Sequence, residues 1–546
     1  MLSPLKFRFV HRPVIVTFLL LAAWGAAPAA TAGSNASSSG TWPRLQVHST
    51  MLDNGLEVLV LERPGSPTVA CYLHFRVGTA DEGPATLGLS HMLEHLLFKG
   101  SRHLNTRDYH KEADIMEEID RVGVALDRAR GEGAEEEKIR ALQAELEELK
   151  KSQHQLLIKD EFESLLLRAG ADTVNGTTWA DATNYFSTLP ANQLELWLAA
   201  MADQMGHAVL REFYQERDVV MEERRLRLED DPQGVLIEAL TSTAFIAHPY
   251  RNSDWMSVLK RLTREDAQRH YETYYGANNA VLALVGDVRF EEVLPLIKKY
   301  MGRLPKRPAP PEIHIEEPAQ RGERRVQVYF DAEPALAIAY HVPGLTHEDE
   351  PALALLSALL GGHGTAGLFE SAALEYPEAT RWSRLYRRLI EKQGLAQEIL
   401  MGGHPGDRYA RLLVLLVQPR APHDLADLER GVLDQLDELK RRRVSPEELD
   451  RARRNLIALY LRILERNMGA AWMIGYTQGV SNDWRTLERY IDALGTVEPT
   501  DVQRVARTYL REHNRTVVWR SAAPDRDEDE LLGGGETAAL QGKGSR

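Results

Sequence analysis

Two histidines and a glutamate occur together in one short segment early in the chain. Residues 88–100 read Gly-Leu-Ser-His-Met-Leu-Glu-His-Leu-Leu-Phe-Lys-Gly, which places His91 and His95 four residues apart with Glu94 beside the second. In a helix this spacing puts both imidazoles on one face, about 40° apart around the axis. Two such nitrogens can bind one tetrahedral Zn²⁺, and a neighbouring carboxylate can take a proton from water. The pattern His-x-x-Glu-His is the inverse of the commoner His-Glu-x-x-His.

An amphipathic helix is a simpler explanation of the same segment. Leu89, Met92, Leu96 and Phe98 have the spacing of a packing face, and the histidines would then lie in solvent. A catalytic zinc site needs a third protein ligand, so the segment alone does not define one.

Candidates for that ligand are Glu216 and Glu223. They are seven residues, or two helical turns, apart and therefore face the same way, whereas Glu222 points elsewhere. The preceding stretch, 191–215, is predicted to be one long helix. An ordinary acidic helix surface has the same spacing, so the two glutamates alone indicate little.

The N-terminus has the features of an export signal. Basic residues precede an apolar run at 14–27, and a small-x-small triplet ending at Ala32 fits a cleavage site. The run is short for a membrane span. We therefore expect a signal peptide at 1–32 and a flexible N-terminus at 33–44, with an uncleaved anchor as the alternative. Cleavage gives an exported protein, periplasmic or secreted, without stable membrane insertion.

The composition is typical of a globular protein with several domains. Of the 546 residues, 43% are hydrophobic and 27% are charged, so two to four domains are expected. Cys71 is the only cysteine, which excludes an intramolecular disulfide. The net charge of −14 argues against nucleic acid as a partner, because phosphate binding needs a basic surface.

Hydrophobic periodicity indicates alternating strands and helices. Residues 51–61 are predicted to form two strands around an Asn-Gly turn, and 69–77 and 172–187 to form one strand each. Heptad-like spacing on both sides of a glycine turn in 109–167 predicts an antiparallel helical hairpin. From residue 326 the same alternation resumes.

These patterns suggest an order of domains. We expect a zinc-binding domain at 45–302 that contains the hairpin, a proline-rich linker at 303–324, a second domain at 325–521 and a disordered tail at 522–546.

Four segments together resemble the pitrilysin/insulinase family of zinc peptidases, the inverzincins. They are residues 88–100, 175–186, 216–223 and 383–395. The likeness is closest to the short-chain bacterial members and to the mitochondrial processing peptidase β-subunit. It implies an α+β protein with two homologous α/β-sandwich-type domains, the second without a zinc site. The stretch between His95 and Glu223 is longer than is usual in the family, and the hairpin accounts for the excess.

The resemblance also implies roles for the motif residues. His91, His95 and Glu223 would bind one Zn²⁺ per chain, and Glu94 would be the general base. Glu216 would be the catalytic-site carboxylate that supports the site without binding the metal. Two histidines and one carboxylate leave a fourth zinc position open, which is the catalytic arrangement.

Residues 175–186 match the edge strand on which members of the family bind substrate. A peptide pairs with this strand as an added strand, so recognition is mainly of backbone. The residues implied to bind substrate are Asn175, Gly176, Thr177 and Thr178.

The second half departs from the family pattern. Full-length relatives carry an Arg and a Tyr, seven residues apart, that hold the substrate's carbonyl groups. The corresponding positions here are Ile390 and Gln397, which cannot do so. The resemblance therefore implies a homologous partner chain that supplies this Arg/Tyr pair, or a homodimer.

From these observations we expect an exported zinc metalloendopeptidase that hydrolyses peptides or unfolded polypeptide segments. It would be the catalytic half of a two-chain clam-shell enzyme. A non-catalytic scaffold or peptide-binding subunit that retains a zinc site is the alternative.

Overall fold

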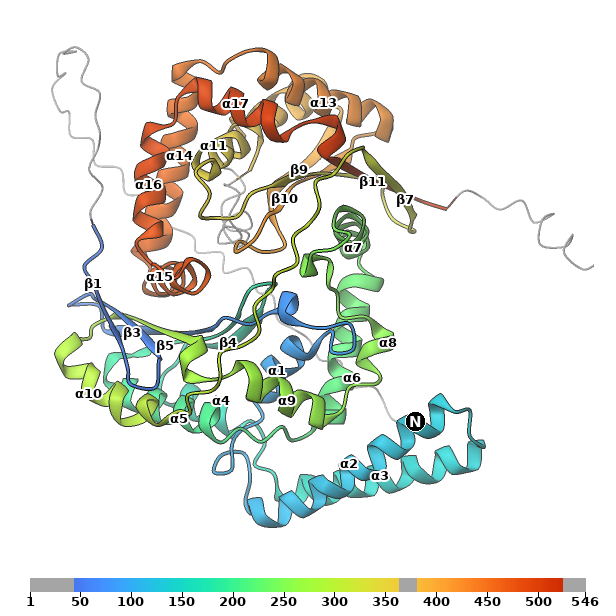
Figure 1. Cartoon of the computed structure of the whole chain (residues 1–546), viewed down its shortest axis with the longest axis vertical. Helices are drawn as coiled ribbons and strands as arrows, with labels where there is room; N and C mark the ends of the chain where they lie inside the picture. Colours follow the sequence, from blue (N-terminus) through green and yellow to red (C-terminus); the bar gives the residue numbers. More distant parts are fainter. Residues whose placement is uncertain (1–43, 363–380, 524–546) are drawn as a thin grey trace, which may run out of the picture. The chain divides into compact units, whose positions relative to one another are not determined.

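The computed structural model describes residues 44–362 and 381–523 (Figure 1). The signal peptide expected at 1–32 lies outside the described residues, as do nearly all of the expected flexible N-terminus and tail. Among the helices of the described ranges, none is long and apolar enough to cross a membrane.

Within residues 44–362 and 381–523, two mixed β-sheets form the framework of the fold. The first has six strands in the order β1 (Val47–Met51), β2 (Glu57–Glu62), β6 (Ala280–Gly286), β3 (Thr68–Phe75), β5 (Thr183–Pro190) and β4 (Thr173–Thr178). The second has five strands in the order β7 (Arg324–Tyr329), β11 (Arg515–Ser521), β8 (Ala335–Val342), β10 (Arg411–Pro419) and β9 (Ala396–His404).

The two sheets repeat one pattern of strand directions. β2 and β6 are parallel, and β3, β5 and β4 then follow with antiparallel neighbours. In the second sheet β7 and β11 are parallel, and β8, β10 and β9 follow in the same way. The predicted α+β class with two similar parts is confirmed, and β4 and β9 are the equivalent edge strands.

Helices surround both sheets. Those of the first part are α1 (Leu89–Leu97), α2 (Tyr109–Gly131), α3 (Glu136–Leu156), α4 (Glu161–Arg168), α5 (Leu194–Gly206), α6 (Phe213–Arg224), α7 (Pro232–Ala244), α8 (Met256–Leu259), α9 (Arg264–Tyr274) and α10 (Phe290–Tyr300). Those of the second part are α11 (Glu350–Leu360), α13 (Leu425–Arg441), α14 (Pro446–Glu465), α15 (Asn467–Ser481), α16 (Thr486–Thr496) and α17 (Pro499–Tyr509).

The helix that covers one face of the first sheet comes from the second part of the chain. α15 packs on β3 and β6, where Gly475 lies against the ring of Tyr72 and Gly479 against the ring of His74. The Nε–H group of Arg76 donates to the carbonyl of Gly479 at 3.1 Å. Since the opposite face packs on the helices of the first part, β3 is buried on both faces. The alternation predicted for 69–77 is therefore absent.

The second sheet receives a helix from the first part in return. α7 packs on β7, β8 and β11, and its Leu236 and Leu240 share one core with residues of that sheet. Nε2 of His341 on β8 lies 3.1 Å from the carbonyl oxygen of Ala244. Each sheet thus depends on a helix from the other part of the chain.

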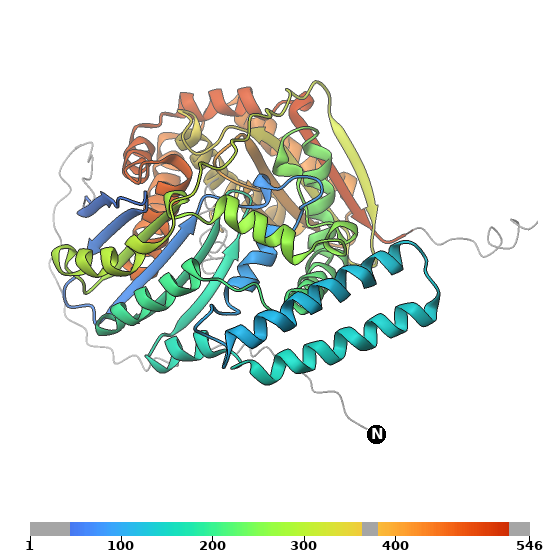
Figure 2. The same cartoon turned by 60° about the horizontal axis from the view of Figure 1, so that its bottom comes forward.

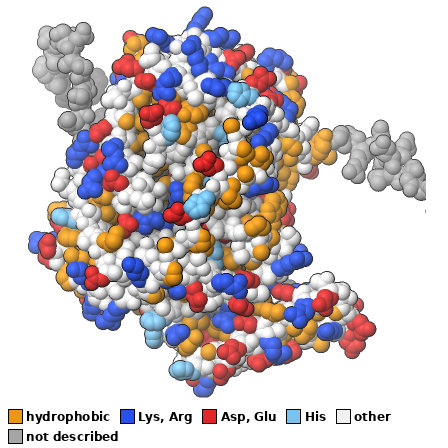
Figure 3. All heavy atoms as spheres, viewed as in Figure 1, with side chains coloured by type: hydrophobic (Ala, Val, Ile, Leu, Met, Phe, Trp, Pro, Cys, Tyr) orange, Lys and Arg blue, Asp and Glu red, His pale blue; other side chains and the backbone are white. Residues whose placement is uncertain are grey.

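The segment between α1 and β4 contains a helical hairpin. α2 and α3 lie side by side (Figure 2), and Arg121 and Glu145 form an ion pair at 2.9 Å between them. The turn contains Gly133 at φ +65°, and a third helix, α4, follows. Acidic and basic side chains alternate over the hairpin (Figure 3), as expected of a solvated surface.

The single strand predicted for 172–187 is wrong, because the segment forms two strands, β4 and β5, with a turn at 179–182. The turn is held by buried Asp181, whose carboxylate accepts the phenol of Tyr250 and the backbone N–H groups of Asp407 and Arg408. Only part of the segment, β4, is therefore an edge strand.

The long helix predicted for 191–215 is also wrong. The chain breaks between α5 and α6, where Glu212 has φ +57°. The break turns Arg211 inward, where it forms a fully buried ion pair with Glu112 at 2.8 Å and donates to the carbonyl of Ser101 at 2.7 Å. These contacts outweigh the helix propensity of the segment.

We expect Gly479→Ala to lower the free energy of unfolding by about 1–3 kcal/mol, because a Cβ there overlaps the His74 ring. Urea unfolding followed by circular dichroism measures the change. The matched control is Gly495→Ala in α16, where a Cβ meets nothing within 4 Å. That variant should be unchanged or stabilised by up to about 1 kcal/mol, so equal losses in both variants would contradict the packing described for α15.

Candidate metal and catalytic site

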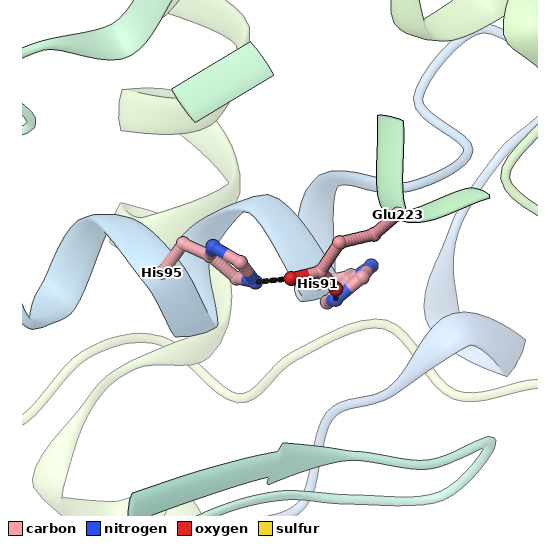
Figure 4. Close-up of side chains that lie close together, drawn as sticks. All are labelled: His91, His95 and Glu223. Carbon is pink, nitrogen blue, oxygen red and sulfur yellow. Dashed lines mark ion pairs between the residues drawn. The ribbon is translucent and has the colours of Figure 1, made fainter. Parts of the chain in front are cut away.

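The helices α1 and α6 bring two imidazoles and one carboxylate together (Figure 4). Nε2 of His91 lies 3.5 Å from Oε2 of Glu223, and Nε2 of His95 lies 3.9 Å from Oε1. Potential ligand atoms of all three residues lie within 4.8 Å of one another. The packing of α6 beside α1 therefore brings together the three side chains that the family resemblance implied as zinc ligands.

The start of α1 is fixed by a carboxylate and a glycine. Buried Glu82 accepts the backbone N–H groups of Gly88 at 2.7 Å and Ser90 at 2.6 Å, which otherwise have no partner within the helix. Gly88 has φ +92°, and a Cβ there would overlap Leu259. Both features set where the two histidines lie along the helix.

The apolar face predicted for this helix is present as well. Leu89, Met92 and Leu96 are fully buried, while the side chains of His91 and His95 keep 18% and 20% of their exposure. The histidines lie on the opposite face among carboxylates, so packing and a polar site coexist on one helix.

Each imidazole has a second carboxylate behind it. Nδ1 of His91 lies 3.5 Å from Oδ2 of Asp254, and Nδ1 of His95 lies 3.3 Å from Oε2 of Glu216. The other oxygen of Glu216 is 2.6 Å from Nζ of Lys99. Carboxylates at both Nδ1 atoms leave both Nε2 atoms for a metal, which is the usual arrangement around metal-bound histidine.

The carboxylates dominate the electrostatics of the site. Burial lowers the pKa of His91, but Asp254 and Glu223 outweigh burial and raise this pKa to about 10. Burial raises the pKa of Glu216, but hydrogen bonds from His95 and Lys99 outweigh burial and lower it. The surroundings thus favour positive charge between the imidazoles.

The residues fit a zinc ion. Oε2 of Glu223 is buried, and no donor among the described residues forms a hydrogen bond to it. This oxygen and the two Nε2 atoms are of the types that zinc binds, and three protein ligands leave a fourth position open.

Glu94 lies between this cluster and the edge strand β4. Its Oε2 accepts the hydroxyl of Thr178 at 2.6 Å, and a Cβ at Gly176 would lie 2.9 Å from its Cγ. The four residues proposed to bind substrate, Asn175, Gly176, Thr177 and Thr178, all lie on β4. Thr177 accepts a hydrogen bond from Asn184 at 3.1 Å and so faces the opposite side of the strand.

Two residues of the site were missed by sequence analysis. Lys99 lies four residues after His95, so helical spacing could have indicated its place beside Glu216. Asp254 lies in a loop before α8, and no spacing to the motif residues could have indicated it.

In the second part, Ile390 lies in a short π-helix, Tyr386–Lys392, and Gln397 on the edge strand β9. Gln397 is exposed and donates to the side chain of Gln418 at 3.0 Å.

Two family descriptions match the chain. Residues 57–126 match "Insulinase (Peptidase family M16)", and residues 261–456 match "Peptidase M16 inactive domain". Both matches fall within peptidase family M16, which confirms the resemblance that the four sequence segments indicated.

Named relatives agree with the family. "Zinc protease PqqE" of Helicobacter pylori is 26% identical over 481 residues, which are 86% of this chain and 92% of the relative. The "Probable mitochondrial-processing peptidase subunit beta" of Arabidopsis thaliana is 24% identical over 57% of this chain and 50% of its own length. A solved protease structure from H. pylori has a TM-score of 0.72 at 25% identity, covering 88% of this chain and all of that one.

We expect the variant His91→Ala plus His95→Ala to lose about one Zn²⁺ per chain relative to the unmodified protein, because two of the three ligands are removed. The measurement is metal content by mass spectrometry after reconstitution and dialysis. Glu222→Gln is the control, since Glu222 lies next to Glu223 but is exposed and pairs with Arg225. An unchanged zinc content in the double variant would contradict the ligand assignment.

Proposed function

We propose that this chain is an exported zinc metalloendopeptidase that cleaves peptides or unfolded polypeptide segments. His91, His95 and Glu223 hold the metal, and Glu94 is the general base. The observation that carries the proposal is the hydrogen bond from Thr178 to Glu94. It joins a carboxylate beside the metal ligands to an edge strand that is available for peptide pairing.

Zinc, when bound, supplies a Lewis acid that polarises the peptide carbonyl and lowers the pKa of water. A peptide that pairs along Asn175–Thr178 is placed beside Glu94. Glu94 accepts a proton from the attacking water and then delivers it to the leaving amine. Glu216, held by Lys99, fixes the orientation of the His95 ring and acts as a positioning residue.

A non-catalytic subunit that keeps a zinc site is the second candidate, either as a scaffold or as a peptide-binding carrier. The match of residues 261–456 to a domain described as inactive favours it. Against it stands the complete set of His91, Glu94, His95, Glu216 and Glu223 in one arrangement.

A partner chain is part of the proposal. The relative named a subunit β supports an assembly of similar chains. β9 is equivalent to β4 in the repeated sheet pattern, yet at Ile390 and Gln397 this part of the chain offers one apolar side chain and one short amide. We propose that a homologous chain provides an Arg and a Tyr for the substrate's carbonyl groups.

We expect Glu94→Gln to lower the hydrolysis of a quenched fluorescent peptide by at least about 10²–10⁴-fold, because an amide cannot accept the proton. Zinc content should remain unchanged, since Glu94 is not a ligand. Glu222→Gln should keep full activity. Near-normal turnover of Glu94→Gln would assign the base to another residue, and zinc binding without turnover under every condition would support the non-catalytic candidate.

We expect the pure chain, fully loaded with zinc, to hydrolyse peptides poorly. Addition of a homologous chain with Arg and Tyr at the positions of Ile390 and Gln397 should raise the rate on the order of 10²–10⁴-fold, because two hydrogen bonds to the transition state are gained. Size-exclusion chromatography with light scattering should show a 1:1 complex. High activity of the single chain would contradict the need for a partner.

A further inference from the structure

A second group of potential metal ligands lies on the segment between α1 and α2 and at the end of α5. It consists of His103, Asp203 and His207, whose ligand atoms lie within 4.8 Å of one another. His103 is on the connecting segment, Asp203 is in the last turn of α5, and His207 follows that helix directly. None of the three belongs to the site around Glu94.

The two imidazoles converge on one carboxylate oxygen. Nδ1 of His103 lies 2.6 Å and Nδ1 of His207 lies 2.9 Å from Oδ1 of Asp203. The ring centroids are 5.3 Å apart and nearly perpendicular. The hydroxyl of buried Ser101 donates to the other oxygen, Oδ2. The hydrogen bond from Ser101 therefore orients the carboxylate of Asp203 so that Oδ1 points between the two imidazole nitrogens.

We propose that His103, Asp203 and His207 form a second Zn²⁺ site. Two imidazole nitrogens and one carboxylate oxygen are a ligand set for zinc and similar divalent transition metals, and water can complete a tetrahedron. The side chains of His103 and His207 are 66% and 51% exposed, so an ion reaches the site from solvent. The hydroxyl of Ser101 would orient the metal-bound carboxylate by its hydrogen bond to the oxygen that does not bind the metal.

The geometry requires only small movements. Ligands at about 2.0–2.1 Å from a tetrahedral ion lie roughly 3.3 Å apart. The present N–O separations are 2.6 and 2.9 Å, so the ring of His103 must move outward by about 0.7 Å and the ring of His207 by about 0.4 Å. Both rings are exposed and can turn, whereas Asp203 is held by Ser101.

Hydrogen bonds also act on the carboxyl group at the centre of the cluster. Burial raises the pKa of Asp203, but Ser101, His103 and His207 outweigh burial and lower it. Without a metal the same residues form hydrogen bonds and ion pairs, which is the alternative that the experiment must exclude.

A cation at this site would link the connection between α1 and α2, through His103, to the end of α5, through Asp203 and His207. The segment is already fastened by an isolated β-bridge between Ser101 and Ala208 and by the buried side chain of Arg211. The metal therefore adds order to residues 101–107 without being required for the fold. This inference does not rest on the proposed peptidase activity.

The test uses the full chain with His91→Ala and His95→Ala, so that zinc at the first site does not contribute. Equilibrium dialysis against Zn²⁺ should give about one equivalent per chain. His103→Ala plus His207→Ala in this background should give none, while His154→Ala plus His513→Ala, which removes two exposed histidines elsewhere, should still give one. Zinc should also slow amide hydrogen exchange in residues 101–107 of the background variant and of the His154/His513 control. It should have no such effect in the variant that lacks His103 and His207.

Absence of zinc binding by the background variant up to millimolar Zn²⁺ would overturn the proposal. So would one equivalent of zinc that persists after His103 and His207 are removed. Because peptide hydrolysis is not measured, failure of this test leaves the proposed function unaffected, and failure of the proposed function leaves this site unaffected.

Discussion

The exchange of helices between the two parts of the chain is the constraint on which the rest of the structure depends. A sheet that is apolar on both faces must be covered on both. α15 covers the first sheet from the second part, and α7 covers the second sheet from the first. Contact is close because Gly475 and Gly479 let the helix approach the rings of Tyr72 and His74. Without the other part, each sheet would have one uncovered face, so residues 304–323 connect two interdependent parts.

A buried carboxylate links the second part of the chain to the candidate site. Asp181, in the turn between β4 and β5, accepts backbone N–H groups of Asp407 and Arg408 and the phenol of Tyr250. A buried charge needs such partners, because its desolvation is otherwise very costly. The second part of the chain thereby fixes the end of β4, and with it the position of Thr178 beside Glu94. A change in the contact between the parts would therefore reach Glu94 through one strand.

Local sequence patterns predicted those features of the structure that depend on interactions between residues close together in the chain. The spacing of His91 and His95 follows from helix geometry, and the hairpin at 109–167 from heptads around a glycine turn. Distant contacts could not be predicted. The turn at Asp181 depends on residues more than 200 positions away, and the break between α5 and α6 depends on carbonyl groups that Arg211 meets only in the folded chain. Roles within the site came from the family resemblance, since spacing could not separate Glu223 from an ordinary surface glutamate.

Because β4 packs closely on α1, some positions of the strand tolerate a change of side chain and others do not. Gly176 and Thr178 face Glu94, and any side chain at 176 would displace it. Thr173 and Asn175 are exposed and alternate with them. Mutations at these outward positions would leave Glu94 in place, so in the proposed peptidase they would alter only which peptides pair with the edge. In the proposed peptidase, selectivity and chemistry would therefore be able to evolve separately on one six-residue strand.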